Sequence, residues 1–218
     1  MGRAVVFDLV RSGHPVRLLE SDLTAAQAVA RRYGGRQVSV ALADAHEPAA
    51  LAERLRGAAV IIHCAPYTFN LKVMEAALRA RCHYLDLGGL FHTTRVQLPH
   101  DDDFRRHGLL GVLGMGSAPG IVNVLARAAA DPLPKVRAVR VYNGGADFTR
   151  YAAPVAFGFS PATVLDEFTL PPMVFEKGRF SAKEPLSGGE DFLFEVGLQR
   201  VHLSLHSEVA TLPLSLQR

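Results

Sequence analysis

The chain contains only two cysteines among its 218 residues, Cys64 and Cys82, and each lies in an apolar stretch. Two cysteines cannot build a disulfide framework, so we expect buried, reduced thiols. No apolar run approaches the roughly 20 residues that span a bilayer. Asp8 lies where a secretory signal peptide needs an uncharged core. These absences predict a cytoplasmic protein without a membrane partner.

Dense blocks of basic residues are also missing. The net charge is +3, but the basic residues are mostly arginines spread along the chain. Nucleic acid is therefore not predicted as a partner. His63 and His83 adjoin the two cysteines, yet their spacing does not match the usual zinc patterns. We therefore predict no metal site.

Helical and strand patterns alternate from the start of the chain to about Asn143. Strands are expected at 16–20, 37–42, 58–63, 83–87, 109–113 and 136–143. Helices are expected at 1–10, 24–33, 48–55, 69–80, 100–107 and 121–130. Strands that are separated by helices predict parallel βαβ units.

After Tyr142, glycines and prolines divide the chain into short pieces. Residues 174–180 predict a tight hairpin with Gly178 in its turn, and further strands are expected at 192–195 and 201–205. We therefore predict an α/β protein of two domains. Residues 1–131 form a doubly wound parallel sheet, and residues 132–218 form part of an α+β substrate domain with a mixed, largely antiparallel sheet.

The beginning of the chain resembles the end of a dinucleotide-binding motif. In a Rossmann unit a strand leads into G-x-G-x-x-G, and an acidic residue about 20 positions on binds the ribose 2′-hydroxyl. Gly2 and Glu20 fit the last glycine and that acid. Because a carboxylate repels a 2′-phosphate, NAD is the expected cofactor and NADP less so. The first strand of the sheet and two glycines would then precede Met1, and this sequence lacks them.

Several residues follow predicted strands, where open α/β sheets bind their ligands. Asp44 borders the expected adenine pocket, although a helix cap explains it equally well. Ala65 and Pro66 would let the cofactor approach the backbone, and Tyr67 would reach the substrate; a rigid turn is the alternative. Asp86 would face the same cleft as a proton acceptor, or else cap the following turn.

Two later segments supply further candidates. The loop 114–120 has the spacing G-x-G-x-x-x-G and opens a helix. The helix N-terminus at Gly120 is predicted to hold a substrate carboxylate, with Asn123 adding a side-chain contact. His206 and Glu208 are candidates for acid–base chemistry or substrate binding, although a lone histidine is more often structural.

Together these segments resemble saccharopine dehydrogenase-like oxidoreductases, including the lysine 6-dehydrogenase branch. The similar segments are Met1–Ala4, Ala65–Asn70, Cys82–Asp86, Gly116–Asn123, Val164–Thr169 and Leu205–Pro213. The last two are most similar to the lysine 6-dehydrogenase branch. Saccharopine reductases carry an aspartate where this chain has Ala118, which favours a smaller amine substrate.

The resemblance implies a homodimeric enzyme that uses NAD or NADP to oxidise or reduce a carbon–nitrogen bond of an amino acid. Asp86 and His206 would then transfer the proton. Polyamine-precursor reduction of the carboxynorspermidine type is another reaction of the family. The family extends beyond both ends of this chain, so we expect strands left unpaired around a missing central strand. We also expect weak NAD binding, and a degenerate, non-enzymatic binding module is the competing hypothesis.

Overall fold

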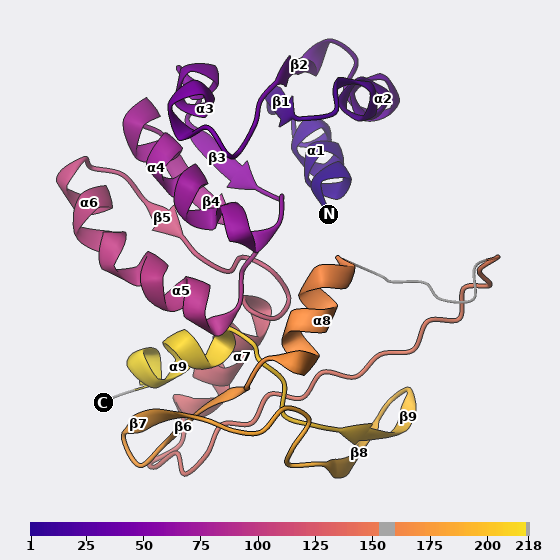
Figure 1. The fold of residues 1–218 in the computed structure, drawn as a ribbon, viewed down its shortest axis with the longest axis vertical. Helices are drawn as coiled ribbons and strands as arrows, with labels where there is room; N and C mark the ends of the chain where they lie inside the picture. The colour runs from indigo at the N-terminus through magenta and orange to yellow at the C-terminus, as the bar shows by residue number, and fades with distance from the viewer. Residues whose placement is uncertain (153–159, 217–218) are drawn as a thin grey trace. The chain divides into compact units, whose positions relative to one another are not determined.

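The computed structural model describes residues 1–152 and 160–216 (Figure 1). The chain divides into two compact units. Unit 1 comprises Met1–Leu87 and Val96–Leu113, and unit 2 comprises Gly88–Arg95 and Gly114–Arg218. The sequence instead predicted a boundary after residue 131. The helix at 121–130 belongs to unit 2 because it packs against the last helix of the chain.

Unit 1 alternates helices and strands, as predicted. Its helices are α1 (Gly2–Arg11), α2 (Leu23–Tyr33), α3 (Pro48–Leu55), α4 (Asn70–Ala80) and α6 (Asp101–Arg106), and α5 (Phe91–Gln97) begins in unit 2 and ends here. Short 3₁₀ turns are η1 (Gly35–Gln37), η2 (Tyr67–Phe69) and η3 (Leu98–His100). Its strands are β1 (Val16–Glu20), β2 (Val38–Leu42), β3 (Val60–His63), β4 (His83–Asp86) and β5 (Gly111–Val112). The sequence missed α5.

The strands of unit 1 form two parallel sheets. One pairs β1 with β2, from Val16 opposite Val38 to Glu20 opposite Leu42. The other has the order β3–β4–β5. The predicted parallel, Rossmann-like arrangement is confirmed. Within the described residues, β1 and β3 each have one edge without a partner strand, as the sequence analysis expected.

Local sequence explains where these elements begin. Asp22 caps α2 by accepting hydrogen bonds from the backbone N–H groups of Thr24 (2.8 Å) and Ala25 (3.0 Å). Pro48 occupies the first turn of α3, where its missing N–H costs nothing. The core of unit 1 lies between α3, α4, β4 and α6. Its buried side chains are Leu51, Ala52, Leu55, Val73, Met74, Ala76, Ala77, Cys82, Tyr84 and Phe104.

Unit 2 combines helices with antiparallel hairpins. Its helices are α7 (Ile121–Ala130), α8 (Pro161–Thr169) and α9 (Glu208–Leu216), and its strands are β6 (Met173–Glu176), β7 (Arg179–Ala182), β8 (Glu190–Phe194) and β9 (Gly197–Val201). The β6–β7 hairpin confirms the predicted turn. Lys177 and Gly178 both have positive φ, 51° and 78°, which suits a two-residue hairpin turn. The sequence missed α8 and α9.

Two predicted strands are wrong. Residues 136–143 have no strand, because this segment packs by side chains and not by a backbone ladder. The Tyr142 ring stacks on Phe192 at 4.3 Å, and its hydroxyl donates to Glu190 at 2.7 Å. The strand predicted at 201–205 is also wrong, since β9 ends at Val201. Beyond it, the Leu205 N–H donates to the Glu167 carbonyl of α8 at 3.0 Å.

No helix among the described residues is both long enough and apolar enough to cross a membrane.

Candidate functional site

The N-terminus of α1 lies beside the loop that follows β3. A Cβ placed on Gly2 would lie 3.6 Å from Cβ of Cys64, which is ordinary van der Waals contact. No side chain caps the start of this ten-residue helix. Burial raises the pKa of the Cys64 thiol, and the positive charge of the chain's amino terminus lowers it in part. An uncapped helix start beside a small-residue loop can receive a phosphate.

Glu20 ends β1 and is exposed. Its Oε1 atom accepts hydrogen bonds from the Ser21 N–H (2.9 Å) and the Ser21 hydroxyl (3.2 Å). A pocket of about 330 Å³ adjoins it at the ends of β1 and β2. The lining residues are Ser21, Leu42, Ala43, Asp44, Glu47, Ala50 and Arg54.

Asp44 lines this pocket and also organises the turn after β2. Its Oδ1 atom accepts the His46 N–H at 2.8 Å and contacts the His46 ring at 3.0 Å. These hydrogen bonds, the backbone one above all, lower the pKa of Asp44. The His46 ring in turn contacts Phe69, with ring centroids 4.7 Å apart. Asp44 thus serves as a turn residue in addition to bordering the pocket.

The loop after β3 carries the next three predicted residues. Ala65 and Pro66 are exposed, and Tyr67 begins η2. The Pro66 carbonyl accepts the Phe69 N–H at 3.0 Å, which closes the turn. Pro66 therefore forms the rigid turn that was the alternative interpretation, and it leaves small, exposed residues at the ligand-binding edge of the sheet.

Asp86 does not face a cleft, contrary to the expectation from the sequence. Its side chain has no solvent exposure. Its Oδ2 atom accepts hydrogen bonds from Gln97 Nε2 (2.8 Å), the Tyr84 hydroxyl (2.9 Å) and Asn70 Nδ2 (3.4 Å). These hydrogen bonds connect β4 with α4 and α5. Asp86 as proton acceptor stays a prediction, and its contacts support a structural role.

His63, at the end of β3, belongs to the same buried region. Burial lowers its pKa, with the nearby Asp86 charge acting in the opposite direction. Its Nε2 atom has no hydrogen-bond partner among the described residues. The sequence analysis missed Asn70 and Gln97 as members of this network. The sequence carried no clear signal for them, because Asn70 begins α4 outside any catalytic motif and Gln97 ends α5, which was not predicted.

In unit 2, the start of α7 is not a free anion site. The Ile121 and Val122 N–H groups donate to the Gly116 and Ser117 carbonyls at 3.0 and 3.1 Å. The Asn123 side chain is also engaged: its Oδ1 accepts the Gly120 N–H at 3.2 Å, and its Nδ2 donates to Thr211 Oγ1 at 3.1 Å. The first N–H groups of α7 thus have acceptors within the chain, and substrate binding by Gly120 and Asn123 stays a prediction.

His206 lies between two carboxylates. Its Nδ1 atom contacts Glu208, the first residue of α9, and its Nε2 atom lies 3.5 Å from Glu167 Oε1 in α8. Burial lowers the His206 pKa, but the hydrogen bonds to Glu167 and Glu208 outweigh it and raise the value to about 9. At neutral pH His206 is therefore cationic and holds a proton already. The sequence missed Glu167.

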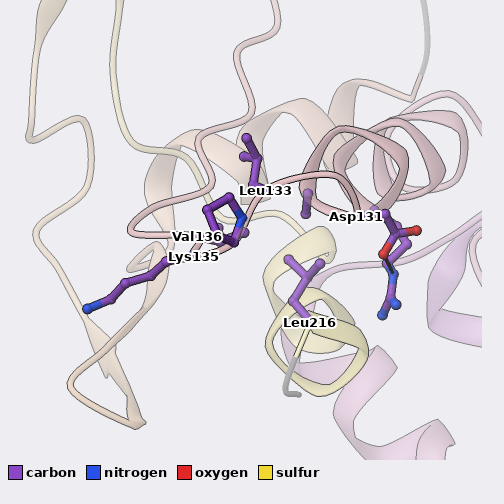
Figure 2. A pocket seen from close by; sticks show the side chains of 8 residues that line it. Asp131, Leu133, Lys135, Val136 and Leu216 are labelled. Carbon is purple, nitrogen blue, oxygen red and sulfur yellow. Dashed lines mark hydrogen bonds and ion pairs between the residues drawn. The ribbon is translucent and has the colours of Figure 1, made fainter.

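A second, smaller hollow of about 170 Å³ lies in unit 2, beside the end of α9 (Figure 2). Two of its polar lining residues are paired with each other, because Arg127 bridges Asp131 at 2.8 Å. None of the predicted site residues lines it. This hollow is not the predicted site.

The predicted site residues are divided between the units. Unit 1 carries Gly2, Glu20, Asp44, Ala65, Pro66, Tyr67 and Asp86, and unit 2 carries Gly120, Asn123, His206 and Glu208. The described residues contain no group of three or more His, Cys, Asp or Glu side chains suited to a metal ion.

Comparison with known proteins agrees with the geometry of unit 1. Residues 1–108 match the family model described as the saccharopine dehydrogenase NADP binding domain. Among solved structures, the chain is similar to apo histidine-tagged saccharopine dehydrogenase (L-Glu forming) from Saccharomyces cerevisiae, with a TM-score of 0.59 and 17% identity. The match covers 87% of this chain and 45% of that one, so this chain spans less than half of that protein's length.

These matches do not distinguish the lysine 6-dehydrogenase branch. They also give no support to the predicted preference for NAD over NADP, since the matching family model describes an NADP binding domain. The structural similarity shows the mixed α/β fold. Residues 1–108 thus match the model of a saccharopine dehydrogenase NADP binding domain, in a chain whose fold is similar to part of the yeast saccharopine dehydrogenase.

Proposed function

We propose that this chain is the dinucleotide-binding and substrate-facing part of an oxidoreductase that acts on a carbon–nitrogen bond of an amino acid. The observation that carries the proposal is the matched domain over residues 1–108, together with the uncapped start of α1 beside Cys64. A bound nicotinamide dinucleotide would accept a hydride from the carbon that bears the amine. The residues of the chain would bind it, orient it and exclude water.

Each part of the ligand has candidate residues in unit 1. The first N–H groups of α1, at Gly2, would bind the pyrophosphate. The pocket beside Glu20, with Asp44 on its wall, would hold the adenosine half. Ala65 and Pro66 are small, exposed residues that allow the nicotinamide half to approach the backbone.

The substrate-binding roles of Tyr67 in unit 1 and of Gly120, Asn123 and Glu208 in unit 2 stay predictions from the sequence. A lysine 6-dehydrogenase-like oxidation remains our first choice, because Ala118 provides no carboxylate where saccharopine reductases have one. Saccharopine itself is the second candidate, and the fold shared with the yeast saccharopine dehydrogenase favours it. With His206 cationic at neutral pH, its protonated form would donate a proton in the reductive direction.

Dinucleotide binding is the first test. We expect Gly2→Asp to weaken binding of NAD⁺ or NADP⁺ by roughly tenfold or more, because it places a negative charge where the pyrophosphate would bind. The same acidic residue favours the first turn of a helix, so the variant should not unfold α1. Calorimetry on the full chain measures both affinities.

Gly2→Ala is the matched control, because its added Cβ meets Cys64 at an ordinary distance. Equal binding by both variants would show that the pyrophosphate does not use this helix. Formation of reduced cofactor with lysine, and none with saccharopine, would support our first choice of substrate.

A further inference from the structure

Helix α7 of unit 2 carries an apolar face that nothing among the described residues covers. The face consists of four exposed side chains spaced three and four residues apart, which are Ile121, Val124, Leu125 and Ala128. The three large ones are 61%, 69% and 60% exposed, in chain order. A contiguous apolar helix face of this kind ordinarily packs against another element or a partner.

The other side of α7 is already committed to α9. Asn123 and Arg127 are the only polar residues of α7. Asn123 Nδ2 donates to Thr211 Oγ1 at 3.1 Å, and Arg127 donates to the Ser215 carbonyl, so both polar side chains bind α9 (Figure 1). The helix cannot turn its apolar face inward without losing these two hydrogen bonds. The face therefore needs a partner other than α9.

The face is complementary in shape to a second copy of itself. When two α7 helices run antiparallel about a two-fold axis between residues 124 and 125, Val124 of each copy meets Leu125 of the other. Ile121 meets Ala128, so a large side chain lies opposite a small one at each end. A parallel pair would instead place Ile121 on Ile121 and leave a gap between the two Ala128 side chains.

The charges around the face also favour the antiparallel pair. The face itself carries no charge, and Arg127 points to α9, so no like charges meet across the axis. Asp131 directly follows the helix and pairs with Arg127 at 2.8 Å. In an antiparallel pair Asp131 lies near the beginning of the other copy's α7, which is the positive end of that helix dipole.

We propose that two copies of this chain associate through the α7 face, with the two helices antiparallel and Val124 of each copy against Leu125 of the other. A standard interface uses about 20–30 residues a side, and one helix face offers far fewer. The dimer is therefore weak, with a dissociation constant in the micromolar range or above. The association does not require a bound dinucleotide, so its test is independent of the proposed function.

Sedimentation equilibrium of the full chain over a wide range of protein concentrations tests the proposal. We expect a reversible monomer–dimer equilibrium. Val124→Glu should raise the dissociation constant by roughly tenfold or more, because it buries unpaired charge at the interface. Val124 is exposed in the single chain, so this variant should fold normally, which circular dichroism checks. Leu198→Glu is the matched control: Leu198 is 68% exposed in β9, and its replacement should leave the dissociation constant unchanged.

A pair of opposite charges tests the register. Val124→Lys and Leu125→Glu should each weaken self-association, and mixing the two variants should restore a dimer in which the new lysine meets the new glutamate. A mixture that associates no better than either variant alone would overturn the antiparallel register.

Two other results would overturn the interface itself. A chain that stays monomeric at every concentration has no second copy on this face. A dimer that persists unchanged in Val124→Glu forms through another surface, such as the open edge of β3.

Discussion

At the scale of single residues, charge and burial separate the roles that sequence position suggested. Asp86 and His206 both occupy positions expected of a proton acceptor. The first is buried under three hydrogen-bond donors, and the second is protonated between two carboxylates. Arg54, which no motif marked, lines the pocket beside Glu20. The motifs therefore indicated which positions to consider, but they did not predict whether a side chain there is buried or protonated.

His206 makes the free energy of unfolding decrease as the pH rises into the alkaline range. Its folded pKa of about 9 exceeds the value of 6.5 expected in the unfolded chain, so the folded state binds the extra proton. This stabilisation is complete below pH 6.5 and is lost as pH rises through about 9. We expect the free energy of unfolding to fall by up to about 1.4 kcal/mol per pH unit in that interval. Urea unfolding at several pH values measures it.

Two histidine variants test whether His206 causes this dependence of the free energy of unfolding on pH. His206→Gln should flatten it, because the titrating group is gone. His14→Gln changes an exposed histidine outside any ion pair of the described residues, and it should leave the slope intact. Equal slopes in the unmodified chain and in His206→Gln would show that Glu167 and Glu208 do not hold the proton.

At the scale of elements, regular patterns in the sequence were reliable where the contacts are local. The strand at 16–20 and the helices at 48–55 and 121–130 have the predicted bounds, because caps, prolines and apolar periodicity lie within the element. The failures came from distant partners. Residues 136–143 have a strand-like pattern, but their side chains pack on β8, and no partner strand forms a ladder with them. Helices α8 and α9 begin or continue through prolines that suggested loops.

The loop before α7 depends on a glycine. Gly120 has φ of +129°, and a Cβ there would lie 2.1 Å from the Gly116 carbonyl oxygen. We expect Gly120→Ala to destabilise the chain by about 2 kcal/mol or more, since both strain and collision oppose it. Gly145→Ala is the control, because nothing lies within 4 Å of its added Cβ. Chemical denaturation compares the two, and equal stabilities would show that the loop can rearrange.

At the scale of the whole molecule, the Rossmann-like order was predictable and the division into units was less so. The predicted boundary lay after residue 131, whereas the contacts assign α7 to unit 2, in which Asn123 donates to Thr211. A pairing of side chains 88 residues apart leaves no local pattern in the sequence. The division of site residues between units was invisible for the same reason.

The two parallel sheets of unit 1 should respond together to ligand. The proposed dinucleotide would contact Glu20 beside one sheet and Ala65 beside the other. We therefore expect NADP⁺ to slow amide hydrogen exchange in both β1–β2 and β3–β5, while the unliganded chain protects them to different extents. Exchange measured by mass spectrometry tests this. Slowing confined to one sheet would contradict binding across both.

The open edge of β3 has a consequence for how the chain behaves in solution. Its residues Val60, Ile61 and Ile62 carry no charge, and natural sheets usually protect such edges with lysine, proline or a bulge. Unpaired N–H and C=O groups next to aliphatic side chains form a template for any extended chain that approaches. We therefore expect this edge of β3 to be a place where an extended chain can pair with unit 1.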